Sequence, residues 1–419
     1  MATTTHPRSV TATEALSVVE PGMTVASTSL SAEPTALLHA LAARTKDLTG
    51  PITLVSGMFL EGYGALSPHL GHDIHLRTWF MPQTLLGDVG LGPHVDFLPL
   101  SWVQTYRYVQ ASSPDVCLIQ VSPADDHGFH SVGISASVNK VLAQRAHTVI
   151  AQVNPQMPYT CGDTLLHESE FDYIVEHNAP LAPFPHRRPD DIDDVIAGHI
   201  VGLIPDGATI QGGIGKVPEA VLKRLATSGH SDLLLTSMLT DAGRELIEAG
   251  VCRSDGPAAI VGEIAGSAEL YRWVDHESRV NLQPAPETHG LKALSARRRF
   301  VSVNSTLEVD LFGQLNSEVV SQGQAGGIGG SVDFMMAGQL DDALSIITLP
   351  STTARGRSRI IPVVDRGLVT APRTLTQVVV TEQGVADLRG LTVGERAQAL
   401  LAVAHPDHRD ELRAALGTA

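Results

Sequence analysis

The sequence has few cysteines and no long apolar run. Cys117, Cys161 and Cys252 are its only cysteines, and they show no CxxC spacing. A sparse, odd count of this kind predicts reduced thiols and a cytoplasmic location. No run of 18 uninterrupted apolar residues is present, so no membrane span is expected. The N-terminus also lacks the basic-then-apolar order of a signal peptide.

Positive charge is scarce as well. The 29 Lys and Arg residues face 45 Asp and Glu residues, which gives a formal net charge of −16. This balance argues against nucleic acids and anionic membranes as partners. Zinc-ligand spacing of His, Asp and Glu is also missing, so no catalytic metal is expected. An anionic small molecule remains compatible, because local N–H groups and Arg can override the global sign.

The length and one proline-rich stretch predict two domains. A chain of 419 residues exceeds what one hydrophobic core usually supports. Residues 180–189 hold four prolines, which disfavour helix and strand interiors. We therefore expect an N-terminal α/β domain over residues 1–183, a linker over 180–189 and a C-terminal α/β domain over 190–419.

Strands and helices alternate in the N-terminal half. The runs 116–121 and 148–153 are continuously apolar and of strand length, as in strands covered on both faces. A helix is predicted between them at 135–145, and further strands at 52–56 and 74–79. Strand–crossover–strand order predicts an open parallel sheet.

The C-terminal half repeats this alternation around residues 208–250. A strand at 208–211 leads into a glycine turn at 212–215 and a helix that opens at Pro218, and a strand at 233–237 leads into a helix at 241–249. Ligands of open α/β sheets bind at the carboxyl ends of such strands. The chemistry is therefore expected near Gly212–Gly215 and Ser237. Further elements are predicted at 258–261, 300–303, 344–349, 377–381 and 393–415.

Three glycine-bearing turns are candidate binding loops. Gly212–Gly215 matches neither a Walker A loop nor a full dinucleotide fingerprint, and a tight βα turn is the simpler interpretation. Gly326–Gly330 has four glycines in five residues, so its backbone can approach a ligand and offer N–H groups to an acyl-transfer intermediate. The third turn contains Glu382, a candidate catalytic carboxylate for which a salt bridge or cap is an equal alternative.

Ordered segments along most of the chain resemble the acetyl-CoA hydrolase/transferase family, especially its 4-hydroxybutyrate CoA-transferase-like members. The matching segments are 32–35, 118–128, 154–163, 210–215, 304–317, 327–334, 379–389 and 404–407. The resemblance implies two related open parallel-sheet domains with the active site between them. It also implies a homodimer that takes a coenzyme A thioester as substrate, without a permanently bound cofactor, and passes the acyl group to an acceptor the sequence does not name.

The resemblance also assigns residues. The loops that would cradle acyl-CoA comprise Gly212, Gly213, Ile214, Gly215, Gly327, Gly329, Gly330 and Asn304. The family's nucleophile is a glutamate just before a Met, which forms a glutamyl-CoA thioester. Ser237 stands at that place here, before Met238. His289 or Thr288 stands nearest a position where the family often has Asn, and Tyr159 replaces an Arg that commonly follows Met-Pro.

The loss of the glutamate leaves four hypotheses. Two substrates could react directly in a ternary complex, or a bound water could hydrolyse the thioester. Ser237 could itself be the nucleophile, with His289 or Glu382 as its base. Glu382 could replace the missing carboxylate in a CoA-transferase. A non-catalytic acyl-CoA-binding protein is the fourth.

Overall fold

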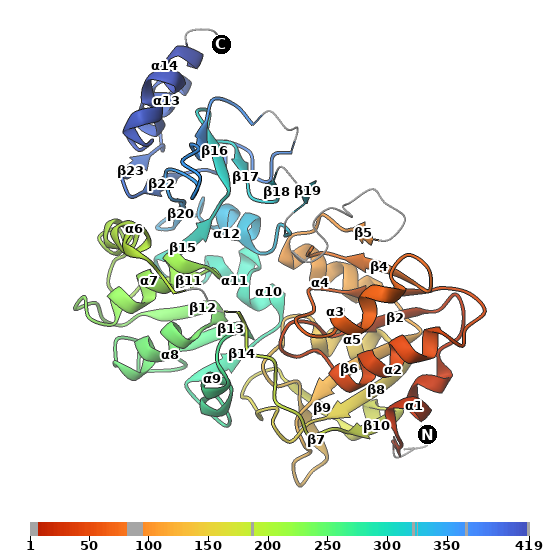
Figure 1. The fold of residues 1–419 in the computed structure, drawn as a ribbon. Helices are drawn as coiled ribbons and strands as arrows, with labels where there is room; N and C mark the ends of the chain where they lie inside the picture. Colours follow the sequence, from red (N-terminus) through yellow and green to blue (C-terminus); the bar gives the residue numbers. More distant parts are fainter. Residues whose placement is uncertain are drawn as a thin grey trace. The chain divides into compact units, whose positions relative to one another are not determined.

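The chain forms two compact units in a computed structural model that describes residues 7–81, 95–185, 188–320, 323–324, 326–364 and 368–416 (Figure 1). The first unit comprises Met1–Pro185, Ile260–Thr288 and Gln322–Gly329, and the second comprises the remaining residues. Of the predicted linker, His186 and Arg187 lie outside the described residues.

An eight-stranded sheet organises the first unit, and all of its strand pairs are parallel. Its strands, in spatial order, are β1 (Arg8–Ser9), β10 (Tyr173–Glu176), β8 (Thr148–Val153), β6 (Val116–Val121), β2 (Thr24–Ser27), β3 (Ile52–Ser56), β4 (Ile74–Thr78) and β5 (Val95–Phe97).

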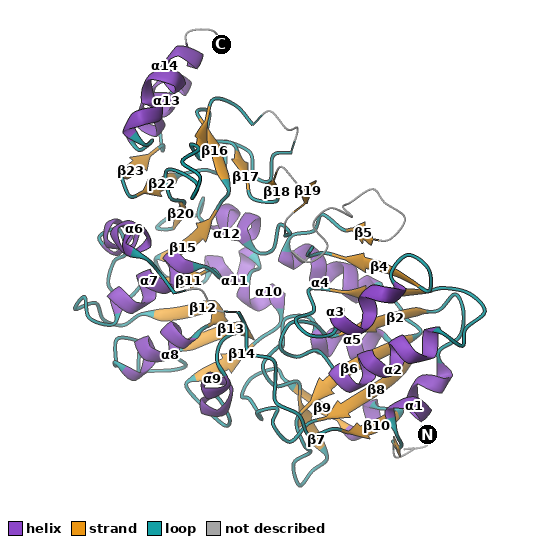
Figure 2. Cartoon of the chain, in the orientation of Figure 1, coloured by secondary structure: helices purple, strands orange, loops and turns teal. Residues whose placement is uncertain are grey.

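Helices cover both faces of this sheet. On one face, Val116 and Leu118 of β6 pack into a core with α2 (Thr35–Thr45), whose residues Leu37, Leu38 and Leu41 are fully buried. The alternate residues of β6 point the other way, and all six of its residues are buried. Helix α5 (Asn139–Arg145) contacts β6, and α4 (Trp102–Ala111) packs on α5 (Figure 2). The helices on both faces of the sheet therefore explain why its central strands are continuously apolar.

The sheet of the second unit has the same character, with one antiparallel edge strand. The strands of this sheet that belong to the second unit run in the order β12 (Leu234–Leu239), β11 (Thr209–Gly212), β15 (Phe300–Ser305), β20 (Leu344–Thr348), β22 (Val378–Thr381) and β23 (Gly384–Asp387). All neighbours are parallel except β22 and β23, which form a tight antiparallel hairpin.

The helices of the second unit pack in groups against this sheet. Helix α7 (Lys216–Leu225) contacts α6 (Asp191–Val201), α8 (Asp241–Glu248) and β11, while α12 (Ser331–Ala337) contacts α11 (Leu291–Ser295) and β15. The last helices, α13 (Val393–Ala402) and α14 (Arg409–Leu416), join a core with Ile347 and Val379 of the sheet.

The predicted fold class is confirmed, since both units are α/β with predominantly parallel sheets. The strands expected at 52–56, 116–121 and 148–153 have those bounds in the structure. The helix expected at 135–145 begins only at Asn139, because the preceding residues form hydrogen bonds with the segment 262–264. There the Ala136 N–H bonds to the Gly262 carbonyl at 2.8 Å, and the Ile134 carbonyl accepts from the Ile264 N–H at 2.8 Å.

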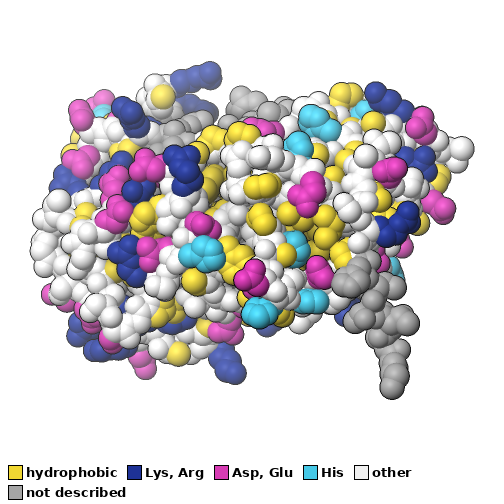
Figure 3. Space-filling view, turned by 90° about the horizontal axis from the view of Figure 1, so that it is seen from below, with side chains coloured by type: hydrophobic (Ala, Val, Ile, Leu, Met, Phe, Trp, Pro, Cys, Tyr) yellow, Lys and Arg dark blue, Asp and Glu magenta, His cyan; other side chains and the backbone are white. Residues whose placement is uncertain are grey.

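The surface is mixed in charge on the face drawn in Figure 3. Acidic, basic and hydrophobic side chains are interspersed there, although the chain carries a net charge of −16. Within the described ranges, the structure has no helix both long and apolar enough to span a bilayer.

Candidate active site

Ser237 occupies a kinked position in β12 of the second unit. Its φ is 78°, in the left-handed region that residues with a side chain rarely adopt. Holding such a conformation costs on the order of 1–3 kcal/mol, and conformations of this kind concentrate at functional sites. The side chain is buried, with 7% of the residue exposed. The strand therefore turns a buried hydroxyl in a direction that regular strand geometry would not give it.

The Ser237 hydroxyl meets the imidazole of His289. The Ser237 Oγ–His289 Nε2 distance is 3.3 Å, and both residues belong to the second unit. With Nε2 unprotonated, the hydroxyl donates and the ring accepts. His289 lies two residues before α11, 52 residues along the chain from Ser237. The fold thus brings together a hydroxyl and a potential base, which is the relation that an activated serine requires.

His289 is neutral because it is buried. Burial lowers the pKa of its imidazole to about 3, since a charged ring would lose its hydration there. The ring packs against Phe334 of α12, with centroids 4.6 Å apart. At neutral pH the ring can therefore accept a proton. Its low pKa also makes it a weak base until a negative charge develops beside it.

Gly330 lies directly against this imidazole. A Cβ at position 330 would sit 2.5 Å from Cδ2 and 2.8 Å from Nε2 of His289, and 2.8 Å from Cε2 of Phe334. Only glycine fits without moving the ring. Of the predicted loop 326–330, the structure thus places Gly330 beside the Ser237–His289 pair.

The first glycine turn and Asn304 follow on the adjacent strands. Gln211 pairs with Thr236, so Gly212 of β11 and Ser237 of β12 come next on neighbouring strands. The Asn304 amide on β15 donates to Gln211 Oε1 at 2.9 Å, and a Cβ at Gly213 would lie 3.5 Å from Asn304 Oδ1. Three adjacent strands therefore carry Ser237, the glycine turn and Asn304.

The remaining glycine-loop residues are placed in different surroundings. Ile214 has 48% of its surface exposed, at the tip of the first turn. Gly327 and Gly329 belong to the first unit: the Gly329 carbonyl accepts from the Trp102 N–H at 3.0 Å, and a Cβ at Gly327 would lie 2.5 Å from the Trp79 carbonyl oxygen. Close backbone approach explains the glycine at 327, and a φ of 56° favours glycine at 329, so neither requires a ligand.

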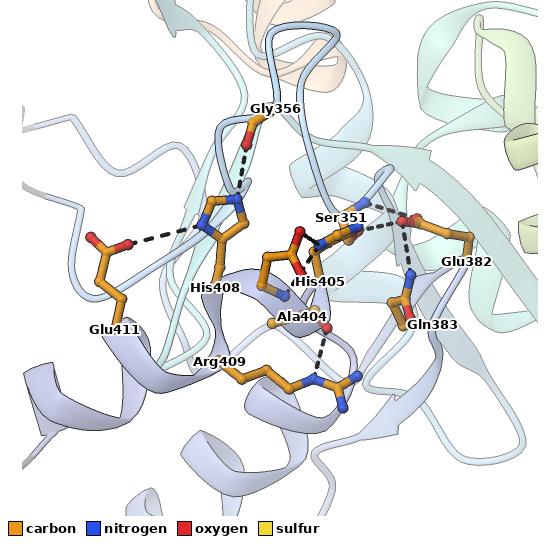
Figure 4. A network of polar contacts seen from close by, with 10 residues as sticks. Ser351, Gly356, Glu382, Gln383, Ala404, His405, His408, Arg409 and Glu411 are labelled. Atoms are coloured by element: carbon orange, nitrogen blue, oxygen red, sulfur yellow. Dashed lines mark hydrogen bonds and ion pairs between the residues drawn. The ribbon is translucent and has the colours of Figure 1, made fainter.

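Glu382 is held in a hydrogen-bonded clamp (Figure 4). It lies in the turn between β22 and β23, and its carboxylate accepts the Ser351 N–H at 2.8 Å as well as the Ser351 hydroxyl. The Gln383 amide donates to it at 3.3 Å. Burial raises the pKa of this carboxyl, but the bonds from Ser351 outweigh burial and lower the pKa overall.

The sheet order separates Glu382 from Ser237. Strand β22 lies four strand spacings from β12, which corresponds to roughly 19 Å. Of the two bases considered for Ser237, the structure therefore brings only His289 to the hydroxyl. The neighbouring residues in Figure 4 have structural partners too: His408 contacts the Gly356 carbonyl at 2.8 Å, and Arg409 donates to the Ala404 carbonyl at 3.0 Å.

Tyr159 is tied into the first unit. Its hydroxyl donates to Asp125 at 3.0 Å, its N–H donates to Asp275 at 2.8 Å, and its ring stacks on His276 with centroids 5.2 Å apart. Burial and the Asp125 bond raise the pKa of the phenol to about 12. Tyr159 therefore fixes a loop as a neutral hydrogen-bond donor.

Sequence reasoning missed Phe334 and Gln211, which support His289 and Asn304. Phe334 follows the glycine loop by four residues, and Gln211 precedes the first turn, so both lay inside segments already singled out. The described His, Cys, Asp and Glu side chains form no group of three that could hold a metal ion.

Comparisons with known proteins identify the family. Residues 3–185 match the acetyl-CoA hydrolase/transferase N-terminal domain, and residues 266–416 match the C-terminal domain. The chain is 39% identical over 306 residues to the 4-hydroxybutyrate coenzyme A transferase of Clostridium kluyveri, covering 71% of each chain. It is 33% identical over 414 residues to the succinyl-CoA:cyclohexane-1-carboxylate CoA transferase of Geobacter metallireducens, covering 95% of this chain and 92% of the relative.

A solved structure supports the same assignment. The crystal structure of RipA from Yersinia pestis superposes with a TM-score of 0.90 at 30% identity, covering 98% of this chain and 97% of RipA. Similarity of sequence and of fold thus extends over both units. The chain belongs to the acetyl-CoA hydrolase/transferase family.

Proposed function

We propose that this protein processes an acyl-CoA thioester at Ser237 and His289, by acyl transfer or hydrolysis, without a glutamyl-CoA intermediate. The observation that carries the proposal is the 3.3 Å contact between the Ser237 hydroxyl and the His289 imidazole. The names of the related enzymes pair a CoA thioester with a carboxylate, which supports an acyl-CoA as the substrate.

The proposed step is attack by Ser237. Its Oγ bonds to the thioester carbonyl carbon while its proton passes to His289 Nε2, and a tetrahedral intermediate forms. The carbon–sulfur bond then breaks, and the leaving thiolate takes the proton from His289. The products are an acyl-serine and free coenzyme A. In the second half, a water or an acceptor that carries a transferable proton attacks the carbonyl carbon of the acyl-serine and gives its proton to the same imidazole. The bond between that carbon and Ser237 Oγ then breaks, and Oγ takes the proton back from His289 Nε2, which restores the free enzyme.

The burial of His289 bears on this step. An isolated imidazolium would be costly in its apolar surroundings, so proton transfer is favourable only when the oxyanion of the intermediate lies close by. Ser237 has a positive φ, and Gly330 has no side chain, so the backbone at position 330 lies close to the imidazole of His289. We propose that these features position the acyl group against the pair.

The direct route competes with this mechanism. A bound acceptor or water could attack the thioester itself, with His289 as base and Ser237 only orienting the ring. Replacement of Ser237 by Ala separates the two routes: loss of thiol release with acyl-CoA supports the serine nucleophile, whereas retained turnover supports direct attack. Binding without turnover in the wild-type protein would instead support a non-catalytic acyl-CoA-binding protein.

A CoA-transferase that uses Glu382 is the less favoured alternative. The carboxylate of Glu382 already accepts bonds from the Ser351 N–H and hydroxyl, and a nucleophile would have to leave them. Replacement of Glu382 by Gln tests this alternative, because it removes the charge and keeps the shape.

Three expectations from the sequence stay predictions. Light scattering of the purified protein would check the homodimer, and limited proteolysis between residues 180 and 189 would check the linker and the two-domain boundary. Fractionation of cells would check the cytoplasmic location.

A further inference from the structure

The first unit carries a pocket on a different set of residues from the Ser237–His289 pair. Its volume is about 310 Å³, and it is formed by the loop 155–158, residues 180–181 and helix α9 (Ala268–Trp273). Met157, Pro158, Leu181 and Tyr271 are buried and give it an apolar floor, while the lining as a whole is nearly as polar as it is apolar. Such a cavity lies at the small end of the range for ligand pockets, so it suits a small molecule rather than a whole coenzyme.

Hydrogen bonds fix the walls of this pocket. The Gln156 amide side chain donates to Asn178 at 2.9 Å, and the Met157 N–H donates to the Asn154 carbonyl at 2.9 Å. On helix α9, the Tyr271 hydroxyl donates to Ser31 Oγ at 2.8 Å. Since a preformed pocket loses little conformational entropy on binding, a small ligand can be held there.

A cation without a partner lies on the rim. Arg272 lines the pocket and is exposed, and in the part of the chain that the structure describes it has neither an ion pair nor a hydrogen bond through its side chain. The other charged residue of the rim, Asp275, already accepts the Tyr159 N–H at 2.8 Å. The chain carries a net charge of −16, yet the Arg272 guanidinium beside this apolar floor has no acidic partner among the described residues.

We propose that this pocket binds a small amphiphilic carboxylate. The acid would receive a two-pronged hydrogen bond from Arg272, whose planar guanidinium matches a carboxylate. Its hydrocarbon would lie on Met157, Leu181 and Tyr271. The site holds the ligand without chemistry, because the residues named at its floor and rim include no nucleophile beside a base.

Binding of hexanoate to the full-length protein tests the proposal. Hexanoate is the probe and 1-hexanol its uncharged counterpart, with saturation-transfer NMR titrations as the readout. We expect saturable binding of hexanoate, with 1-hexanol about tenfold weaker or more, because a hydrogen-bonded charge pair contributes about one decade in affinity. Absence of saturable hexanoate binding would overturn the proposal.

Three variants locate the site. Arg272→Gln should weaken hexanoate about tenfold. Ala268→Leu, which places a larger side chain at the pocket rim, should also weaken it. Arg279→Gln is the matched control, since Arg279 is an exposed arginine of the same unit that pairs with Glu277 at 2.7 Å, and its affinity should equal that of the wild type. Equal hexanoate affinity in the wild type and Arg272→Gln would place the acid elsewhere and overturn the proposal.

Discussion

Two hydroxyl-containing contacts in the second unit of this protein have opposite characters. Ser237 contacts a buried, neutral imidazole through one 3.3 Å bond on a kinked strand. Ser351 contacts a half-buried carboxylate, Glu382, through both its N–H and its hydroxyl. The first contact leaves the hydroxyl and the ring able to exchange a proton. The second satisfies the carboxylate and joins a loop to the β22–β23 turn.

The difference shows how to separate a reactive group from a structural one. A carboxylate whose pKa is lowered by bonds from its own fold is stabilised as an anion and loses nucleophilicity. A neutral histidine with a lowered pKa is held in the form that can accept a proton. On these grounds we propose a chemical role for Ser237 and His289 and a structural role for Glu382.

Replacing Ser237 should have the largest effect on turnover. Ser237→Ala removes the proposed nucleophile, and we expect thiol release from acyl-CoA to fall about 10³-fold or more. The matched control is Ser302→Ala, which removes another buried strand hydroxyl in the same sheet, one that makes no hydrogen bond in the described structure. Ser302→Ala should stay close to wild type. Similar activity in Ser237→Ala and Ser302→Ala would contradict the serine route.

Replacing His289 should have the next largest effect. His289→Gln keeps a polar side chain but removes the base, and general-base contributions are typically about 10²- to 10⁴-fold. Steady-state rates with acyl-CoA measure the loss, and thermal unfolding confirms that the variant is folded. A folded His289→Gln protein with wild-type rates would show that His289 is not the general base.

Crowding the imidazole should have an intermediate effect. Gly330→Ala places a Cβ 2.5 Å from Cδ2 and 2.8 Å from Nε2 of His289, so the ring must shift from its position beside Ser237. We expect turnover to drop about 10- to 100-fold, since misplacement by about 1 Å can cost two decades. Gly394→Ala is the control, because a Cβ there meets no atom within 4 Å. Equal rates in both variants would show that the ring position is unimportant.

The pH dependence of stability should also report on His289. Its pKa in the folded protein, about 3, lies below the ordinary value of 6.5, so the folded state binds fewer protons than the unfolded state. The resulting stability is present above pH 6.5 and is lost as the pH falls toward 3. At pH 5 the loss amounts to about 2 kcal/mol.

Denaturant unfolding of wild type and His289→Gln at pH 7.5 and pH 5 measures this effect. The wild-type protein should lose about 2 kcal/mol more than the variant over that interval. An equal loss in both proteins would mean that His289 is not buried as a neutral ring.

The smallest effect on turnover is expected at Glu382. Glu382→Gln should leave the rate within about threefold, while the free energy of unfolding falls by about 1–2 kcal/mol because the bonds to Ser351 lose their charge. Ser351→Ala should destabilise the protein similarly, and the double variant should show coupling between the two positions. A large loss of turnover in a stable Glu382→Gln protein would instead support the carboxylate-dependent transferase.

The fold was predictable wherever the hydrophobic signal was local. The strands at 116–121 and 148–153 are continuous apolar runs, and their bounds follow directly from the sequence. Strand β23 was not predicted, because it is a short edge strand in which buried and exposed residues mix. The non-helical segment before α5 was missed because its partners, around Gly262, lie more than 100 residues away.

The members of the candidate site were predicted from the sequence, but the choice between His289 and Glu382 as the partner of Ser237 was not. Ser237 and His289 were both named from the sequence, yet 52 residues separate them and only the fold puts them in contact. The positive φ of Ser237 has no sequence signal, since serine is not a residue that favours it. The clamp on Glu382 likewise depends on Ser351, 31 residues earlier, which no motif connected to it.

Trapping the acyl-enzyme tests the central claim most directly. The protein is mixed with acyl-CoA, quenched with acid within milliseconds to seconds, digested and mapped by mass spectrometry. We predict the mass of the acyl group on the peptide that contains Ser237, stoichiometric release of coenzyme A, and no acyl group on that peptide in Ser237→Ala. A coenzyme A adduct on Glu382, or full turnover by Ser237→Ala, would contradict the account.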